Sequence, residues 1–428
     1  MGSTGGPGRP GPGRPRGAGR RVGPEALVLL GWALTRAALL TAVLGWWRFP
    51  GQDVTPDVAV AYHQWFERLR TGAFPAHDVT WQYPPGSAGA FLAPALLPCL
   101  SYAHAFFLLA CAADAVVLGL LTRAAREGGP GRMAGPWLWV TGIALLGPTV
   151  LARYDVMVAA LAVAALVAVA RHPRLAGVLA GAGALVKVWP VLVLAGVTPG
   201  RGTRRAWASA VGAAVALAAG FHLLTRNSFA FLGTQSRRGV EVESVAALPF
   251  QLARWLGMWH GVVRYHYGSY EFLGPHVGVA GPVALAASAA GLGWLLWWRL
   301  RARTFNDALV YDAAFTAVLV FVVTSRVISP QYMIWLVGLG ALCLTCRSTT
   351  QRRPVLLVLA ACALTVLEFP VDFHAVTGST TEGVALLLGR DGLLLVATVA
   401  ACRGVWRGTT PSPDPSTLTN RPALPASA

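Results

Sequence analysis

The sequence predicts an all-α membrane protein, a polytopic transmembrane helical bundle, and three observations support this class. Of the 428 residues, 55% are hydrophobic and 12% are charged, and the mean hydropathy is +0.55, which is too apolar for an ordinary soluble domain. Apolar stretches near the roughly 20 residues needed to cross a bilayer recur from Ala26 to Ala401. Arginines fall mainly in the short links between these stretches. We therefore expect about 10 to 13 membrane segments, short broken helices included.

The charge pattern and the ends of the chain set the limits of this domain. A net charge of +17 would indicate nucleic-acid binding in a soluble protein, but here it reflects membrane orientation, and we expect no nucleic-acid partner. Residues 1–25 are rich in Gly, Pro and Arg and lack the apolar core of a signal peptide. We predict disordered cytoplasmic tails at 1–25 and 404–428, and one membrane domain at 26–403 in the plasma membrane.

The cysteines and carboxylates give no sign of a metal or redox centre. All six cysteines lie in or at the ends of apolar stretches, where cysteine usually behaves as a small hydrophobic residue. Cys343 and Cys346 have CxxC spacing but no second pair of ligands accompanies them. We expect no disulfide, no metal site and no cofactor.

The positive-inside bias orients the first spans. The span Ala26–Trp47 follows the arginine-rich tail, so it starts in the cytoplasm and residues 48–86 form a first outer loop. The short stretch Ser87–Leu100 contains two prolines and is predicted as a partial or interfacial helix. Three further spans, Tyr102–Leu121, Trp137–Val150 and Val156–Ala170, then return the chain to a basic cytoplasmic link.

The next apolar stretch, Leu175–Val197, breaks the alternation. A single crossing would place Arg201, Arg204 and Arg205 outside, against the positive-inside bias. Two half-helices that meet near Lys187-Val188-Trp189-Pro190 would return the chain to the cytoplasm, and the proline accounts for the break. Such non-helical backbone is tolerated only against protein or a watery cavity.

The remaining stretches follow the same alternation of spans and loops. Ala206–Leu224 leads outward to a second outer loop at residues 225–275, which is polar. The spans that follow are Val277–Trp298, Ala308–Val323, Met333–Leu344, Val355–Leu367 and Val384–Ala401.

This topology gathers the unusual polar residues on the outer side. A charge at the bilayer centre costs roughly 2.5 to 3.5 kcal/mol, so such residues are usually paired, hydrated or functional. We therefore predict a functional site at the outer face. The residues placed there are Asp53, Asp57, Asp78, Tyr83, Arg153, Asp155, Lys187, Arg237, Arg238, Glu241, Glu243, Arg326, Gln331, Tyr332, Glu368 and Asp372.

Each of the sharper candidates also has a plain structural interpretation. Lys187 is the only lysine of the chain and is either a snorkelling side chain or a cation directed at phosphate from the apex of the broken hairpin. Arg153 and Asp155 either neutralise a span boundary or hold a sugar or a phosphate. Residues 58–70 carry apolar side chains on one helical face, which suits a helix on the membrane surface or a simple re-entry device.

Five segments in this order resemble a known family. They are Asp57 with Tyr83-Pro84-Pro85, Arg153-Tyr154-Asp155-Val156, Lys187-Val188-Trp189-Pro190, residues 238–244, and Ser329-Pro330-Gln331-Tyr332 followed by Trp335. Together they resemble the GT-C superfamily of membrane glycosyltransferases and, within it, glycosyltransferase family 87, the polyprenol-phosphate-mannose-dependent α-mannosyltransferases of actinobacteria. The resemblance extends over most of the chain, from Ala26 to Ala401.

The resemblance implies an extracytoplasmic active site, a carboxylate of the first outer loop as general base and a lipid-linked monophosphosugar as donor. Asp57 is the predicted base because it opens the loop helix, and the neighbouring Asp53 is an alternative. Asp155, Glu241 and Glu243 are lesser candidates. The implied partners are membrane lipid, the donor and a glycolipid or glycan acceptor, with no obligate protein partner.

The chemistry of this reaction assigns roles to the other polar residues. The leaving group is a lipid phosphate, which needs charge stabilisation more than protonation. The candidate phosphate ligands are Arg153, Lys187, Arg237, Arg238 and Arg326, and the predicted substrate-binding set also includes Asp53, Tyr83, Asp155, Glu243, Gln331 and Tyr332. A transporter or flippase for a lipid-linked sugar is the alternative, although we find no pair of related halves. A non-catalytic membrane scaffold is a third class.

Overall fold

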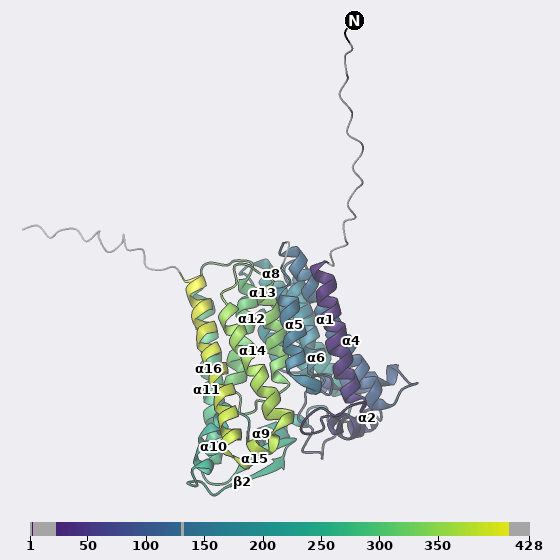
Figure 1. Ribbon diagram of the computed structural model, residues 1–428, viewed down its shortest axis with the longest axis vertical. Coiled ribbons are helices and arrows are strands. Elements are labelled where there is room, and N and C mark those ends of the chain that lie inside the picture. The colour runs from purple at the N-terminus through teal and green to yellow at the C-terminus, as the bar shows by residue number, and fades with distance from the viewer. Residues whose placement is uncertain (1, 3–22, 130–131, 411–428) are drawn as a thin grey trace, which may run out of the picture.

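A computed structural model describes residues 2, 23–129 and 132–410 (Figure 1). Most of the two predicted tails therefore lies outside the described residues. Within the described part, six helices are long and apolar enough to cross a membrane, and five shorter apolar helices accompany them. The long ones are α1 (Pro24–Val43), α4 (Tyr102–Glu127), α8 (Arg201–Leu224), α11 (Val277–Arg301), α14 (Arg352–Val366) with its extension η7 (Leu367–Val371), and α16 (Thr381–Thr409). The shorter ones are α5 (Ala134–Leu145), α6 (Asp155–Ala168), α7 (Pro173–Val186), α12 (Leu309–Thr324) and α13 (Tyr332–Leu344).

This arrangement confirms the predicted all-α, polytopic bundle. The short helices α12 and α13 are apolar all round and almost entirely buried, and they form the centre of the molecule. By contrast, α8 and α11 lie at the periphery and expose large apolar side chains such as Val215 and Leu285, as helices facing lipid do. The last helix extends to Thr409, beyond the predicted domain boundary at 403.

The predicted broken hairpin is present. Helix α7 ends at Val186, Lys187 has extended backbone, and the chain returns as the 3-10 helix η5 (Trp189–Gly196). The return is complete, because the carbonyl of Val197 accepts a 2.6 Å hydrogen bond from Arg299 at the arginine-rich end of α11. Helices α7 and α8 then run parallel, since Gly177 lies against Ala206 and Gly181 against Ala210.

The first long loop contains the predicted surface helix. It forms as the π-helical turn η1 (Asp57–Tyr62) followed by α2 (His63–Leu69), with Val58, Tyr62, Trp65 and Leu69 buried beneath it. The predicted partial helix follows as three short turns, η2 (Pro85–Ser87), α3 (Ala88–Leu92) and η3 (Ala93–Leu96).

The second long loop contains a sheet that the sequence analysis did not predict. After α9 (Phe231–Arg237), three antiparallel strands, β1 (Val240–Glu241), β2 (Val262–His266) and β3 (Ser269–Leu273), pair in the order β1-β3-β2. Helices η6 (Val245–Ala247) and α10 (Leu248–Trp255) lie between β1 and β2. The turn of the β2–β3 hairpin has positive φ at Tyr267 and Gly268, and Gly268 reaches Thr80 of the first loop.

Both long loops lie at one end of the bundle, which we call the loop end. Figure 1 shows α2, α9, α10, α15 (Phe373–Gly378) and β2 together at its lower edge. The opposite end carries the basic links, where Arg126 pairs with Glu25 and Arg171 lies 2.8 Å from Glu127. The structure thus brings together the two loops that the sequence analysis assigned to one side of the membrane.

Candidate active site

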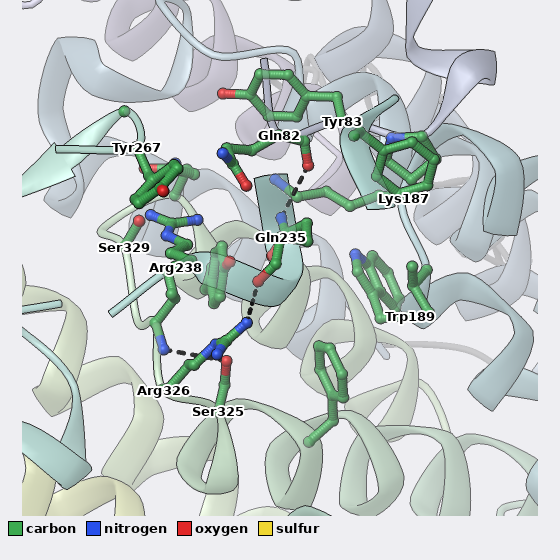
Figure 2. Close-up of a pocket in the computed structure, with 18 of the residues that line it drawn as sticks. Gln82, Tyr83, Lys187, Trp189, Gln235, Arg238, Tyr267, Ser325, Arg326 and Ser329 are labelled. Atoms are coloured by element: carbon green, nitrogen blue, oxygen red, sulfur yellow. Dashed lines mark hydrogen bonds between the residues drawn. The ribbon is translucent and has the colours of Figure 1, made fainter. Parts of the chain in front are cut away.

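A pocket of about 380 Å³ opens at the loop end, where five segments distant in sequence meet (Figure 2). They are the first loop at Thr80–Pro84, the hairpin apex at Lys187–Trp189, helix α9, the β2–β3 turn, and the link between α12 and α13. The pocket brings together six of the predicted site residues. These are Tyr83, Lys187, Arg238, Arg326, Gln331 and Tyr332.

Lys187 is held at the pocket wall by a buried ion pair. Its Nζ lies 2.6 Å from Oδ1 of Asp155, and the indole nitrogen of Trp335 donates a 2.8 Å hydrogen bond to the same oxygen. The lysine side chain is 13% exposed and that of Asp155 is 1% exposed. The ammonium group therefore does not snorkel to the surface but remains paired beside the pocket.

Aromatic rings surround this ammonium group. Lys187 Nζ lies 4.9 Å from the ring centroids of Tyr154 and Trp335 and 5.3 Å from that of Tyr332. Tyr332 stacks on Trp335 at 4.0 Å, and Trp335 stacks on Trp189 at 5.1 Å. The three stacked rings give the pocket a flat, apolar wall beside a cation.

Arg326 is a cation without an acidic partner. It donates a hydrogen bond to the backbone carbonyl of Gln235, and no carboxylate of the described residues lies within 4.0 Å of it. Burial and the nearby Arg238 lower the pKa of the Arg326 guanidinium below its ordinary value, and the charge of Glu271 offsets this shift only in part. An anion entering the pocket would supply the missing charge.

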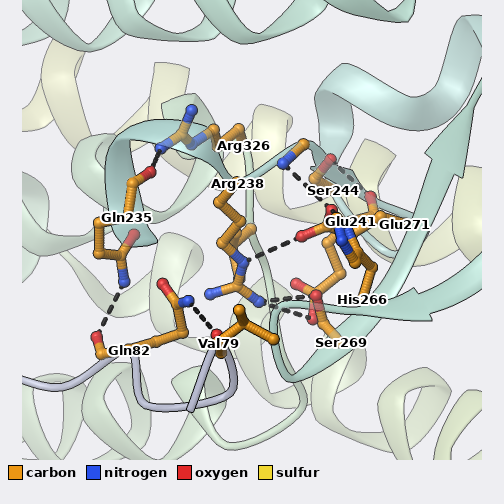
Figure 3. A network of polar contacts seen from close by, with 12 residues as sticks. Val79, Gln82, Gln235, Arg238, Glu241, Ser244, His266, Ser269, Glu271 and Arg326 are labelled. Carbon is orange, nitrogen blue, oxygen red and sulfur yellow. Dashed lines mark hydrogen bonds and ion pairs between the residues drawn. The ribbon is translucent and has the colours of Figure 1, made fainter. Parts of the chain in front are cut away.

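Arg238 is instead held from behind by a polar network (Figure 3). It donates a 2.7 Å hydrogen bond to Ser269 Oγ, and its Nε lies 3.4 Å from Glu271. Glu241 lies 4.0 Å away and accepts a 3.0 Å hydrogen bond from Ser329, a pocket residue. Burial raises the pKa of the Glu241 carboxyl. The small sheet thus fixes the guanidinium of Arg238 at the pocket.

The predicted base stands at the edge of this site. Oδ2 of Asp57 lies 2.6 Å from Arg153, whose side chain is 10% exposed, whereas that of Asp57 is 50% exposed. Tyr83 lines the pocket, and burial, followed by the charges of nearby Asp57 and Asp155, raises the pKa of its hydroxyl. Asp57 is therefore oriented by an arginine, open to solvent and adjacent to the pocket.

Three predicted residues do not join this group. Asp53 is exposed and accepts hydrogen bonds of 2.9 Å from the backbone and hydroxyl of Thr55, so it forms a local turn before the loop helix. Arg237 is exposed on α9 and bonds to the carbonyl of Gly233. Glu243 is buried away from the pocket, where its backbone carbonyl binds Arg390.

The structure adds pocket residues that sequence reasoning did not single out. Gln235 of α9 donates a 2.9 Å hydrogen bond to the carbonyl of Gln82 and so ties the second loop to the first. Tyr267, at the hairpin turn, lines the pocket opposite the broken hairpin. An alternating stretch at 262–273 interrupted by Tyr-Gly is a hairpin signal that would have pointed to the second of these.

Comparisons with known proteins identify the chain's relatives. The model of glycosyltransferase family 87 matches residues 81–330, more than half of the chain, and this range contains Tyr83, Arg153, Lys187 and Arg238 but not Asp57. No curated protein matches. Among solved structures, the crystal structure of ArnT from Cupriavidus metallidurans bound to undecaprenyl phosphate is similar, with 15% identity and a TM-score of 0.48 over 90% of this chain and 78% of that one.

Proposed function

Because this chain belongs to glycosyltransferase family 87, we propose that it transfers a sugar, in the first instance mannose, from a polyprenyl-phosphate donor to a lipid or glycan acceptor. The observation that carries this proposal is the convergence of Lys187, Arg238 and Arg326 on one pocket, with Arg326 lacking an acidic partner among the described residues. Such a pocket suits a phosphate group better than a neutral sugar alone.

The cations act on the leaving group. In the donor the phosphate is a diester with one negative charge, and breaking its bond to the anomeric carbon leaves a monoester that carries more negative charge. Guanidinium and ammonium groups fixed beforehand around that phosphate stabilise the charge as it develops. Arg238 is fixed by Glu271 and Ser269, and Lys187 by Asp155, so neither has to reorganise during the reaction.

Asp57 is the general base of the proposed reaction. A sugar hydroxyl has a pKa well above 10, so a carboxylate must accept its proton as the new bond forms. Asp57 is solvent-accessible and oriented by Arg153. Asp155 is buried and already bound to Lys187 and Trp335, and Asp53 is bound to Thr55, which makes both less suitable.

The reaction is a single displacement that inverts the anomeric centre. The acceptor oxygen forms a bond to the anomeric carbon, the bond from that carbon to the phosphate oxygen breaks, and the proton passes to Asp57. A β-linked mannosyl donor would give an α-mannoside. We propose that the step needs neither metal nor organic cofactor, since the polyprenyl-phosphate sugar is itself the co-substrate.

We propose that the site faces away from the cytoplasm, at the plasma membrane. The basic links lie at the end of the bundle opposite the pocket, and such links favour the cytoplasmic side. The start of α1 lies at that same end, where Glu25 pairs with Arg126, and we therefore propose a cytoplasmic N-terminus.

The test is transfer of labelled sugar in membranes that contain the chain. Membranes are supplied with labelled mannosyl or arabinosyl polyprenyl phosphate, and the glycolipids are extracted and separated, with membranes lacking the chain as control. We expect chain-dependent transfer from the mannosyl donor. Transfer from the arabinosyl donor alone would correct the sugar, and transfer from neither would contradict the proposal.

A further inference from the structure

A second hollow adjoins the active-site pocket at the side of the bundle. It has a volume of about 470 Å³ and lies between α11 and α12. Phe321, Ser325 and Arg326 line both this hollow and the active-site pocket, so the two share a wall at these residues. We call it the α11–α12 groove.

The groove is mostly apolar, and its one charged lining residue lies where it meets the pocket. Its walls include Pro282, Ala284 and Leu285, and Leu285 is 73% exposed on the outer surface of the bundle. Arg326 is the charged residue that lines it, at the junction with the pocket. A ligand that fills both spaces therefore has a negatively charged group at the junction and an apolar chain that leaves toward lipid.

Local sequence keeps this passage open. A Cβ atom built on Gly281 would lie 3.8 Å from a terminal nitrogen of Arg326, with no other atom of the described residues within 4 Å. Farther along, Ser288 donates a 3.0 Å hydrogen bond to the carbonyl of Thr324 and holds the two helices together. From Gly281 to Ser288 the groove follows α11 for about 10 Å.

We propose that the α11–α12 groove holds the first isoprene units of the donor's polyprenyl chain, with the donor phosphate at Arg326. This inference rests on the proposed function and adds the path by which the lipid leaves the site. A polyprenyl-phosphate sugar must keep its phosphate in the polar pocket while its chain stays in the bilayer. The wall shared with the pocket, and a cation at that wall with no acidic partner among the described residues, both fit this ligand.

A neighbouring hollow does not fit as well. It lies on the other face of α11, lined by residues such as Val283 and Val323, and it shares only Ser325 with the active-site pocket. Neither lysine nor arginine lines it. It therefore lacks a contact for the phosphate at its inner end.

The test fills the groove with one side chain. Gly281→Leu places an isobutyl group in the passage, and Gly293→Leu is the matched control, because a Cβ on Gly293 of the same helix meets no atom within 4 Å. The purified variants are compared using mannosyl donors whose phosphate carries either a long polyprenyl chain or a single isoprene unit. Equal thermal unfolding temperatures establish that both variants fold.

We expect Gly281→Leu to lower kcat/KM for the long-chain donor by about tenfold or more, because the phosphate can no longer settle in place, and to change the short-chain reaction much less. Gly293→Leu should leave both reactions unchanged. Equal long-chain activity of the two variants would overturn the groove assignment, whereas a wild-type protein inactive with every donor would overturn the proposed function itself.

Photocrosslinking, which needs no catalytic turnover, tests the groove assignment separately from the proposed reaction. Polyprenyl phosphate with a photoreactive group in its first isoprene unit should crosslink to α11 or α12, and Gly281→Leu should reduce that labelling severalfold. Crosslinks confined to other helices, or labelling that Gly281→Leu leaves intact, would contradict the proposal.

Discussion

Lys187 shows how one buried pair can serve both stability and binding. Its ammonium group neutralises Asp155, which is 1% exposed, and it also lines the pocket. Removing the lysine alone leaves an uncompensated carboxylate, which typically costs about 3 kcal/mol or more. A loss of activity in that variant would not by itself distinguish a phosphate ligand from a structural residue.

The double variant separates the two roles. Lys187→Met should lower the thermal unfolding temperature, and Lys187→Met with Asp155→Asn should restore most of it, because no charge then remains buried. Transfer activity should stay at least about tenfold below wild type in both, since the phosphate has lost a cation. Wild-type activity in a stable double variant would show that Lys187 only supports the fold.

Glu243 is a predicted site residue that is buried away from the pocket. It lies in the second loop, and burial together with the neighbouring Glu368 and Glu241 raises the pKa of its carboxyl well above the ordinary 4.5. The folded protein therefore holds this proton at pH values where the unfolded chain has released it. The contribution of this group to the free energy of unfolding is therefore largest below about pH 4.5, and it is lost as the pH rises through the folded-state pKa.

The pH dependence of unfolding tests this assignment. As the pH rises above the ordinary carboxyl pKa of 4.5, the wild-type unfolding temperature should fall, and that of Glu243→Gln should fall less steeply. Glu67→Gln is the control because Glu67 is exposed on α2. Parallel curves for wild type and Glu243→Gln would mean that Glu243 is ionised in the folded protein.

At the scale of elements, the broken hairpin depends on close packing between α7 and α8. A Cβ atom on Gly177 would lie 2.0 Å from the carbonyl oxygen of Ala206, and one on Gly181 would lie 2.2 Å from that of Ala210. These two glycines, four residues apart, let the helices approach as small residues do in membrane interfaces. Lys187 at the apex owes its position to this contact.

Alanine substitutions should therefore have opposite effects at different glycines. Gly177→Ala should destabilise the protein by about 3 kcal/mol, because the clash outweighs the gain of about 1 kcal/mol in helix propensity. Gly212→Ala, on α8 where no atom lies within 4 Å, should be neutral or slightly stabilising. Thermal unfolding in detergent measures both, and a stable Gly177→Ala variant would contradict the packing.

The broken hairpin was predicted and the small sheet was missed because the two leave different signals in the sequence. The hairpin break at Lys187 was predictable because Arg201 and its neighbours fixed the side of the membrane and Pro190 supplied a cause. In the small sheet, β2 and β3 leave an alternating pattern at 262–273, which indicates a hairpin. By contrast, β1 has two residues and is set by the tertiary pairing of Val240 with Phe272, so it leaves no periodicity in the sequence.

The pairing of charged residues inside the bundle also could not be predicted from the sequence. Arg36 of α1 binds Asp114 of α4 through two hydrogen bonds of 2.9 Å and donates a third to the carbonyl of Val140, and both side chains are almost fully buried. The pair lies far from the pocket residues and satisfies itself, so it joins three helices. Sequence position alone did not show that these two residues were partners.

For the whole molecule, the proposed reaction requires the loop end to face away from the cytoplasm. Cysteine substitutions at His77 of the first loop and at Ser348 of the opposite end, made in a Cys99→Ser background, place single exposed thiols at the two ends. A membrane-impermeant thiol reagent added to intact cells should label the His77→Cys protein. The Ser348→Cys protein should react only after the membrane is opened, and the reverse pattern would invert the topology.

The whole molecule also explains why the site could be predicted only in part. Six predicted residues meet in the pocket for two reasons: they lie on the same side of the membrane, and the folded loops bring them together. Only the side of the membrane could be predicted from the sequence. The six are Tyr83, Lys187, Arg238, Arg326, Gln331 and Tyr332. The contacts of Asp53 with Thr55, and of Glu243 in its buried cluster, depend on local and tertiary geometry. The sequence analysis therefore grouped those two residues with the site only because they lie on the same side of the membrane.

The role of Asp57 as general base is tested by a kinetic comparison of Asp57→Asn with Asp53→Asn in purified protein, using long-chain mannosyl polyprenyl phosphate. We predict that Asp57→Asn lowers kcat by about 100-fold or more while the donor KM changes little, because the base acts on the acceptor hydroxyl and not on the donor phosphate. Asp53→Asn should keep kcat within a few-fold of wild type. A stable Asp57→Asn variant with wild-type kcat would contradict the account.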